Sequence, residues 1–392
     1  MPVAAARFAY AGGMDIRAQL SGDVAALTEA IIACESVSGN ELHLADAVES
    51  ALRQYSSLRL HRDGDTIIAR TETGAAQRII LAGHLDTVPL PTVAGSRGTV
   101  PPSWELADGV DVLYGRGATD MKGGVAVQLK LADDVAAHLA AGGALDRDIT
   151  WVFYDHEEVE AHKSGLGRVM GSVPELLAGD FAVLLEPTHG VVEGGCNGTC
   201  RFEVTIPGVA AHSGRAWMGE NAIHGAAPLL QVLAQYVPQT IRVEGLDYRE
   251  GLNAVRIRGG VAGNVIPDST VVEINYRFAP DKTEEQAHAH VQEVLATANI
   301  APEQVRITDS SAAARPGLDH PAAEAFVQAV GGEPMPKYGW TDVARFSARG
   351  IPAVNFGPGD PLLAHSDDEH VTAAALRACH LALHRWLLGD VL

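Results

Sequence analysis

The stretch Ile79-Ile-Leu-Ala-Gly-His-Leu-Asp86 decides the fold class. Its first four residues form an uninterrupted apolar run, and a glycine, a histidine and a carboxylate follow within four positions. A short continuous apolar run is typical of a strand buried on both faces, as in parallel sheets covered by helices. Ligands of open α/β sheets bind outside the carboxyl ends of the strands. The stretch therefore predicts an α/β protein whose functional groups follow its buried strands.

Apolar runs and helical patterns alternate through much of the rest of the chain. Further buried strands are expected at Thr66–Ala69, Ile149–Tyr154, Phe181–Leu185 and Ala353–Phe356. Helices are expected at Val24–Cys34, Glu41–Arg53, Met121–Ala141, Ala322–Val330 and Ala373–Leu388. The Pro-rich stretch Pro89–Trp104 is expected to be a surface loop. This alternation indicates an α/β layer structure with a largely buried sheet.

The pattern changes near residue 194. Arg201–Ile206 and Ser269–Phe278 alternate apolar and polar residues, which is typical of a sheet with one solvated face. Two helical patterns accompany these strands, at Asn221–Tyr236 and Thr283–Ala298. We expect a small inserted α+β domain at 194–311, which interrupts a main α/β domain formed by 14–193 and 312–392.

Composition narrows the class of protein. The chain has 392 residues, enough for about two domains. Its 49 acidic and 29 basic residues give a net charge of −20, which argues against binding to nucleic acid or to anionic lipid. There is no run of about 18 apolar residues, so we expect no membrane span. Met1–Gly13 lacks the apolar core of a signal peptide, and we expect a loose extension with Met14 as an alternative start.

Imidazoles and carboxylates recur where predicted strands end or a helix begins. They are His84, Asp120, Glu157, Glu158, Glu186 and His365. If the strands form one sheet, these side chains converge on one edge although they are far apart in sequence. Mixed nitrogen and oxygen donors suit a catalytic Zn²⁺, Co²⁺ or Mn²⁺ site. Taken singly, each has a simpler interpretation as a packed or solvated side chain; their joint occurrence favours the metal site.

The spacing of these residues suggests a division of roles. Two metal ions about 3.5–4 Å apart need a shared carboxylate, and Asp120, at a helix start, suits that position. Of the adjacent Glu157 and Glu158, one can bind metal while the other takes a proton from the attacking water. Asp86, two residues after His84, suits a carboxylate that orients a metal-binding imidazole.

Two other patterns are weaker. The glycines of Gly115–Gly124 fit neither G-x-G-x-x-G nor a phosphate loop ending in G-K-[ST]. Cys196 and Cys200 have no second cysteine pair nearby, which argues against a structural zinc site. Four sparse cysteines indicate reduced thiols and a cytoplasmic protein.

The motifs together resemble a known family. They are Gly83–Pro89, Gly115–Gly124, Glu157-Glu158, Glu186-Pro-Thr188 and His365–Glu369, in this order. They are similar to those of the dinuclear-zinc amidohydrolases, which include desuccinylases, acetylornithine deacetylase, aminoacylase and glutamate carboxypeptidase. From about residue 20 onward, the resemblance implies a zinc-exopeptidase-like catalytic domain with a mixed, mostly parallel sheet flanked by helices. The insertion at 194–311 then corresponds to a dimerisation, or lid, domain.

The resemblance also implies roles for individual residues. It implies two Zn²⁺ ions per subunit, with Co²⁺ as an alternative metal, bound by His84 and Glu186 at one ion, Glu158 and His365 at the other, and Asp120 as the bridge. Glu157 corresponds to the general base, and Asp86 to the carboxylate that orients a ligand. The implied reaction is amide hydrolysis, in which Glu157 takes a proton from water and returns it to the leaving amine.

The lid of the family carries a histidine that reaches the partner subunit's site and stabilises the oxyanion. His212, in Gly208-Val-Ala-Ala-His212, corresponds to it. The proline often found shortly after this histidine is absent here, and Trp217 lies nearby. The resemblance thus implies a homodimer joined through the lid.

The candidates for substrate binding are arginines, one asparagine and a motif near the C-terminus. Arg277 and Asn264 lie in segments that resemble those holding the substrate carboxylate, whereas we expect Arg256 and Arg258 to be surface residues of the lid. Arg215 is a further anion-binding candidate.

Thr341, in Thr341-Asp-Val-Ala-Arg-Phe346, resembles a motif of the desuccinylase and deacetylase branch. The branch implies a small N-acyl amino acid as substrate. We expect N-succinyl-LL-2,6-diaminopimelate, an intermediate of lysine and cell-wall biosynthesis. Acetylornithine deacetylase, N-acyl amino acid hydrolase and dipeptidase activities are the alternatives.

Overall fold

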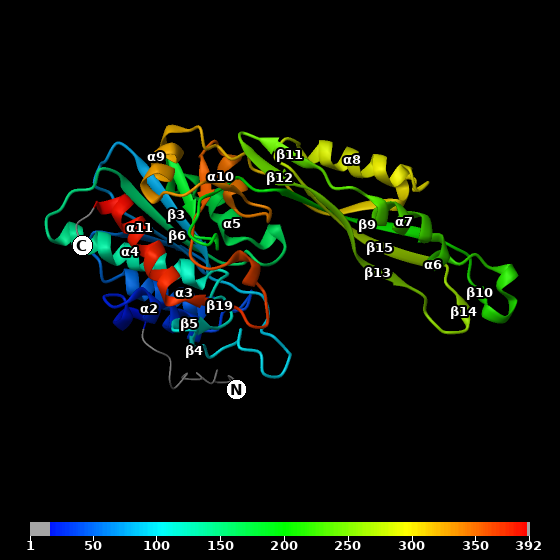
Figure 1. Cartoon of the computed structure of the whole chain (residues 1–392), viewed down its shortest axis with the longest axis horizontal. Coiled ribbons are helices and arrows are strands. Elements are labelled where there is room, and N and C mark those ends of the chain that lie inside the picture. The colour runs from blue at the N-terminus through cyan, green and yellow to red at the C-terminus, as the bar shows by residue number, and fades with distance from the viewer. Residues whose placement is uncertain (1–15, 390–392) are drawn as a thin grey trace, which may run out of the picture. The chain divides into compact units, whose positions relative to one another are not determined.

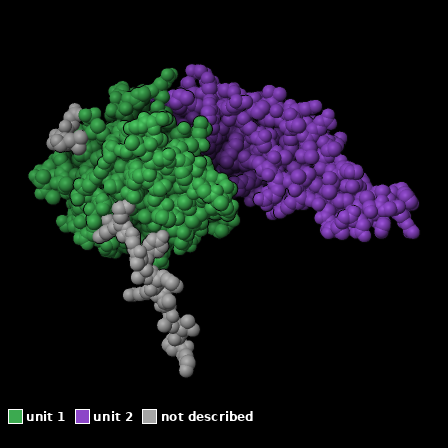
Figure 2. Space-filling model, turned by 60° about the horizontal axis from the view of Figure 1, so that its bottom comes forward, with its two compact units in different colours: residues 1–192, 319–333, 354–392 green, residues 193–318, 334–353 purple. Residues whose placement is uncertain are grey.

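The computed structural model describes residues 16–389, so the expectations for Met1–Gly13 and Met14 lie outside the described residues. The chain divides into two compact units (Figure 2). Unit 1 comprises the chain up to Val192, Asp319–Glu333 and the chain from Val354; unit 2 comprises Glu193–Leu318 and Pro334–Ala353. Within residues 16–389, no helix is both long and apolar enough to cross a lipid bilayer.

Unit 1 is built on a mixed sheet with the strand order β1-β2-β6-β3-β7-β18. The strands are β1 Arg59–Asp63, β2 Thr66–Arg70, β3 Arg78–His84, β6 Asp148–Tyr154, β7 Phe181–Leu184 and β18 Ala353–Asn355. β3 runs parallel to both β6 and β7, whereas β1 and β2 are antiparallel to their neighbours. Every residue of β6 and β7 is buried, which explains their uninterrupted apolar runs. The expected α/β class is confirmed.

Helices cover this sheet and complete unit 1. They are α1 Ile16–Gln19, α2 Val24–Ala33, α3 Leu42–Leu52, α4 Lys122–Ala140, α5 Gly165–Ser172, α9 Pro321–Val330 and α11 Ala373–Leu388. In Figure 1, α4 and α11 lie side by side, and α4 also packs against β3. Gly124 of α4 permits a close approach to the end of β7, because a Cβ there would overlap the carbonyl oxygen of Leu185. The start of α4 is therefore held at the carboxyl edge of the sheet.

A small three-stranded sheet adjoins these elements, in the order β19-β5-β4. Its strands are β4 Ser103–Ala107, β5 Val110–Tyr114 and β19 His370–Thr372. The loop expected at Pro89–Trp104 thus ends two residues early, since Ser103 and Trp104 already belong to β4.

Unit 2 contains a four-stranded antiparallel sheet in the order β13-β15-β9-β16. Its strands are β9 Gly198–Pro207, β13 Gly251–Gly259, β15 Ser269–Phe278 and β16 Val305–Ser311, and its main helices are α6 Ala222–Gly225, α7 Ala227–Gln235 and α8 Glu284–Ala296. In Figure 1, α7 and α8 lie along this sheet. The buried side chains of β9 and β15 pack with Leu229, Val291 and Leu295 of the two helices. The alternating strands therefore bury one face beneath the helices, as their period of two indicates.

Short elements complete unit 2. They are β8 Glu193–Gly194, β10 Ala211–His212, β11 Thr240–Val243, β12 Leu246–Arg249, β14 Val265–Ile266, β17 Met335–Pro336 and α10 Val343–Ser347. The single helix expected at Asn221–Tyr236 is instead two helices, α6 and α7, because Pro228 lies in the first turn of α7 and has no N–H to continue the hydrogen-bond ladder. Unit 2 also includes Pro334–Ala353, a return of the chain that no periodic pattern indicates.

Candidate active site

Six side chains meet at the carboxyl edge of the unit 1 sheet, and we call them the strand-end cluster. They are His84, Asp120, Glu157, Glu158, Glu186 and His365, and their donor atoms fall into overlapping groups of three within 4.8 Å of one another. His84 ends β3, Glu186 follows β7, and the two adjacent glutamates follow β6. Because these three strands are parallel neighbours, their ends deliver the side chains to one place. The structure thus brings together all six residues chosen from the sequence.

Asp120 lies at the centre of the strand-end cluster. Its Oδ1 is 3.2 Å from Nε2 of His84, and its Oδ2 is 3.3 Å from Nε2 of His365. His365 Nε2 is also 3.0 Å from Oε1 of Glu158. Each oxygen of one carboxylate therefore faces a different imidazole, which is the arrangement that a carboxylate bridging two cations requires.

His84 is held in one orientation by Asp86. The Nδ1 atom of His84 is 3.0 Å from the backbone oxygen of Asp86 and 3.6 Å from its carboxylate Oδ1. An Nδ1–H that donates to this backbone oxygen leaves the lone pair of Nε2 for a metal ion. The expected orienting contact thus runs mainly through the main chain of Asp86.

The carboxylate of Asp86 organises the chain after β6 instead. It accepts the backbone N–H groups of Glu157 at 2.9 Å and Glu158 at 3.0 Å, and the hydroxyl of Ser38 at 2.6 Å. Burial opposes ionisation of Asp86, but the hydrogen bond with His84 and the other donors lower its pKa below the ordinary value. An ionised Asp86 therefore fixes the main chain of both adjacent glutamates.

The electrostatics of the strand-end cluster favour cations. Hydrogen bonds to Asp120 and Glu158 raise the pKa of His365 to about 10. Burial opposes protonation of His84, yet its contacts with Asp120 and Asp86 raise its pKa well above the ordinary value. Burial raises the pKa of Glu158, whose like-charged neighbour Asp120 acts in the same direction. The closely spaced carboxylates are therefore stabilised by nearby positive charge, which protons or metal ions can supply.

Sequence reasoning assigned no role to a further pair, Glu369 and Arg116. Both side chains are almost fully buried, and Oε2 of Glu369 accepts Nη1 of Arg116 at 2.7 Å. Its Oε1 accepts the backbone N–H groups of Thr119 and Asp120, both at 3.0 Å. Glu369 therefore positions the main chain that carries the central carboxylate. The signal was present, since Glu369 ends the His365–Glu369 motif.

His212 and Asn264 lie together in unit 2. β10 pairs with β14, and the backbone N–H of Ser213 donates to the carbonyl of Asn264 at 2.9 Å. The Nδ1 atom of the exposed His212 accepts the N–H of Gly214 at 3.0 Å. In the neutral imidazole this leaves the proton on Nε2, which is therefore a hydrogen-bond donor.

Arg277 lies at the other end of β15 from this segment, about 27 Å along the strand from Ser269. Burial lowers the pKa of its guanidinium, and the neighbouring charge of Arg201 acts in the same direction. The two arginines expected at the surface are indeed paired there: Arg256 with Glu273 at 3.6 Å, and Arg258 with Glu203 and Glu273 at 2.8 and 2.9 Å. Arg277 is therefore the better candidate for binding an anion.

Thr341 is buried in unit 2. Its carbonyl oxygen lies 3.7 Å from the Sγ atom of Cys196. The four predicted substrate and oxyanion residues of unit 2 therefore form no single cluster within that unit: His212 and Asn264 adjoin each other, whereas Arg277 is far along the sheet from them.

Comparison with known proteins shows the family of the chain. The model of the peptidase family M20/M25/M40 matches residues 80–389. The chain is 47% identical over 371 residues to a Mycobacterium tuberculosis protein named "Putative succinyl-diaminopimelate desuccinylase", with 94% of this chain and 99% of that protein covered. It is 42% identical over 353 residues to the succinyl-diaminopimelate desuccinylase of Corynebacterium glutamicum, with 89% and 92% covered.

A solved structure shows the same fold. The M20 family metallo-carboxypeptidase of Sulfolobus solfataricus superposes with a TM-score of 0.72 at 14% identity, covering 93% of this chain and 98% of that one. The family match extends from the third residue of β3 through the end of α11 and includes every residue of the strand-end cluster. The resemblance seen in the sequence motifs is therefore confirmed, and the chain belongs to the M20/M25/M40 peptidase family of metallohydrolases.

Proposed function

We propose that this chain is a succinyl-diaminopimelate desuccinylase, which hydrolyses N-succinyl-LL-2,6-diaminopimelate to succinate and LL-2,6-diaminopimelate. The observation that carries the chemistry is the strand-end cluster, in which six acidic and imidazole side chains converge at one sheet edge. The choice of substrate rests on similarity along nearly the whole chain to two proteins of that name.

The donor set of the strand-end cluster fits two divalent metal ions. In this proposal His84 and Glu186 would hold one ion, Glu158 and His365 would hold the other, and Asp120, which contacts both imidazoles, would serve both ions. Borderline metals such as Zn²⁺ accept this mixture of imidazole and carboxylate ligands, and Co²⁺ is an alternative. When bound, such ions lower the pKa of water and polarise a carbonyl group.

Glu157 is the general base in this proposal. The hydrogen bond from its backbone N–H to Asp86 fixes its position beside Glu158. With Glu158 serving as a ligand, the carboxylate of Glu157 accepts a proton from the water that attacks the amide carbonyl. It then delivers that proton to the nitrogen of the leaving amine, so that one carboxylate acts in both halves of the reaction.

His212 stabilises the charge that develops on the carbonyl oxygen. Its Nε2–H is a donor because its Nδ1 already accepts the N–H of Gly214. A donor directed at a developing oxyanion is typically worth about 10²–10³-fold in rate. In the proposal, the protein is a homodimer, and His212 of each subunit acts on the active site of its partner. The homodimer is proposed to be cytoplasmic.

The surface of unit 2 supports a homodimer. β13 is an edge strand of the four-stranded sheet, and its Val255 and Ile257 are 59% and 48% exposed. An edge strand with exposed apolar side chains is a ready site for pairing with another chain. Analytical ultracentrifugation tests this point: the expected mass is twice the chain mass of 41.2 kDa, and a single-chain mass at working concentration contradicts it.

Arg277, Asn264 and Thr341 recognise the substrate in this proposal. The substrate carries three carboxylates, and a guanidinium binds a carboxylate through two parallel hydrogen bonds. Arg277 suits this role because it is half-buried and its guanidinium forms no ion pair with any side chain of residues 16–389.

The deciding experiment measures the hydrolysis of N-succinyl-LL-2,6-diaminopimelate by zinc-loaded protein. N-acetylornithine and N-acetylmethionine are run in parallel. Zinc-dependent release of succinate from the first compound alone is the expected result. Hydrolysis of only an N-acetyl compound would retain the chemistry but refute the substrate, and no hydrolysis of any of the three would refute the proposed activity.

A further inference from the structure

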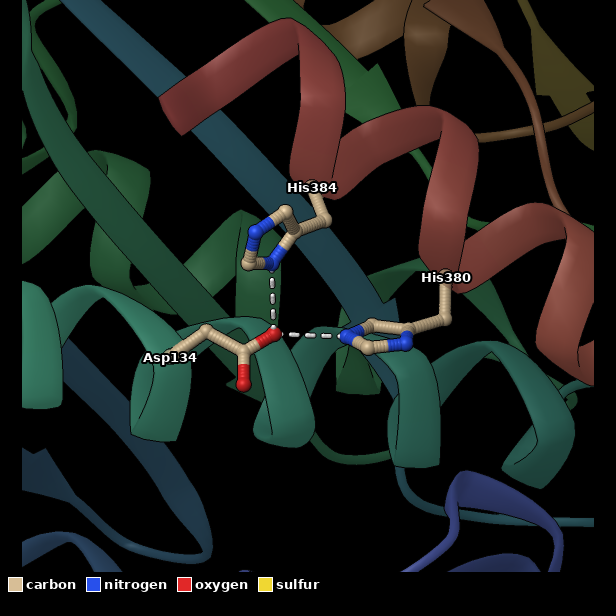
Figure 3. A group of neighbouring side chains, drawn as sticks. All are labelled: Asp134, His380 and His384. Atoms are coloured by element: carbon tan, nitrogen blue, oxygen red, sulfur yellow. Dashed lines mark hydrogen bonds and ion pairs between the residues drawn. The ribbon is translucent and has the colours of Figure 1, made fainter. Parts of the chain in front are cut away.

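Unit 1 contains a second group of imidazole and carboxylate side chains, away from the strand-end cluster. Asp134 of α4 faces His380 and His384 of α11, and we call these three residues the helix cluster (Figure 3). Oδ2 of Asp134 is 2.6 Å from Nε2 of His380 and 3.0 Å from Nδ1 of His384. Asp134 lies twelve residues beyond Lys122, the first residue of α4, which is about 18 Å along the helix.

We propose that the helix cluster is a second metal site, which binds one Zn²⁺ through Asp134, His380 and His384 and links α4 to the C-terminal helix. The two histidines are four residues apart, so they project from the same face of α11. In Figure 3 both rings point toward the same carboxylate oxygen on the facing helix. Two imidazoles and one carboxylate are a donor set that zinc accepts, with a water molecule as fourth ligand.

The spacing of the three donor atoms admits an ion after a small adjustment. Ligands of tetrahedral zinc, with bonds of about 2.0–2.1 Å, lie roughly 3.3 Å apart. The present separations of 2.6 and 3.0 Å are shorter, because the imidazoles hydrogen-bond directly to the carboxylate. Opening them by less than about 1 Å requires only small side-chain rotations.

Neighbouring charged side chains hold the carboxylate of Asp134 in place and leave the helix cluster with a net negative charge. Lys130 Nζ is 3.1 Å from Oδ1 of Asp134 and 2.6 Å from Oδ2 of Asp133. Oδ1 of Asp134 is thus held by a cation while Oδ2 faces the histidines, as is common for carboxylates that bind metals. One lysine against two aspartates leaves one negative charge to attract a cation. Burial opposes ionisation of Asp134, but its hydrogen bonds to both histidines hold its pKa well below the ordinary value.

The side chains of the helix cluster are partly accessible to solvent. The side chains of His380, Asp134 and His384 are 17%, 13% and 7% exposed. An ion can therefore reach the donors from solvent and retain a water ligand, while most of its surroundings are protein. Such a site binds only when α4 and α11 are packed together, so zinc should stabilise the folded state.

The test counts zinc on the full-length protein. Metal-free protein is equilibrated with buffered free Zn²⁺, and the zinc bound per chain is measured by inductively coupled plasma mass spectrometry. The variant His380→Gln/His384→Gln is expected to hold one equivalent fewer than wild type while retaining its substrate turnover. The matched control is His138→Gln, on the same helix α4 but outside the cluster, which should hold as much zinc as wild type.

Turnover separates this site from the active site. An equivalent of zinc lost together with turnover would have come from the strand-end cluster, and that result would overturn the proposal. Equal zinc content in the folded double variant and wild type would overturn it as well. If the double variant does not fold, Asp134→Asn, which keeps the size of the side chain, decides by the same count. Zinc is also expected to raise the melting temperature of wild type more than that of either variant.

Discussion

The strand-end cluster and the helix cluster are both made of histidines and carboxylates, but they are built differently. The strand-end cluster gathers side chains from strand ends and loops, where distant parts of the sequence converge. The helix cluster lies on two regular helices, one turn of α11 facing one residue of α4. Six donors crowd the first site, whereas the second has three donors and a neighbouring lysine.

This difference suits the strand-end cluster to catalysis and the helix cluster to stabilising the fold. In the strand-end cluster, converging carboxylates concentrate negative charge at the proposed active site, so changes there should alter the reaction. In the helix cluster, the donors bridge two packed helices, so changes there should alter metal content and stability while the reaction proceeds.

The largest expected effect is on turnover when the proposed base is removed. Glu157→Gln keeps the size of the side chain but cannot accept the proton, so kcat should fall about 10²–10⁴-fold. The metal content should match that of wild type, because Glu157 is not a proposed ligand. The matched control is Glu160→Gln, an exposed glutamate three residues on that pairs with Lys163. Undiminished turnover in Glu157→Gln would refute its role as the base.

The next effect concerns the buried pair of Glu369 and Arg116. Glu369→Gln leaves the guanidinium of Arg116 without its buried counter-charge, which should lower the free energy of unfolding by about 3–5 kcal/mol. Because Glu369 also holds the backbone of Asp120, turnover should fall as well. Urea denaturation and kcat measure the two effects. Asp368→Asn, at the exposed neighbour, is the control, and equal stability of the two variants would contradict the positioning role.

His212 tests whether unit 2 completes the strand-end cluster from another subunit. His212→Ala should lower kcat about 10²–10³-fold, the usual cost of losing one oxyanion donor. If it acts in the partner's site, mixing His212→Ala subunits with Glu157→Gln subunits creates heterodimers with one intact site. Partial recovery of activity is expected on mixing. Confirmed heterodimers without recovery would place His212 outside the partner's site.

Much of unit 1 could be predicted from the sequence because its strands are buried on both faces. The apolar run before His84 is such a strand, and the apolar run that ends at Tyr154 lies beside it in the sheet. The convergence of His84, Glu157, Glu158 and Glu186 follows from the same pattern, since parallel strands end at one edge. Asp120 follows β5 of the small antiparallel sheet, so its place in the cluster does not follow from that rule. In unit 2 the expectation of one helix at Asn221–Tyr236 was wrong, because it did not allow for Pro228 within that stretch.

Features that depend on distant chain segments could not be predicted in this way. Glu369 binds the backbone of Asp120 from a segment about 250 residues later, and no local pattern encodes that contact. The spacing of His380 and His384 is visible in the sequence, but their partner Asp134 emerges only when α11 packs on α4. Spacing within one helix is thus readable, whereas the facing residue is a property of the packing.

The smallest expected effect is on the free energy of unfolding of metal-free protein when the helix cluster is changed. In excess chelator, Asp134→Asn loses the charge that the two histidines and Lys130 share, but its amide oxygen still accepts a hydrogen bond. The free energy of unfolding should therefore fall by only about 1–3 kcal/mol, as for hydrogen bonds to a charged group. Because hydrogen bonds to the histidines depress the pKa of Asp134, this difference should be present near neutral pH and shrink as the pH falls below the ordinary aspartate value. Chemical denaturation at several pH values measures it. A constant difference across that range would mean that the carboxylate charge contributes nothing, and that packing alone joins the two helices.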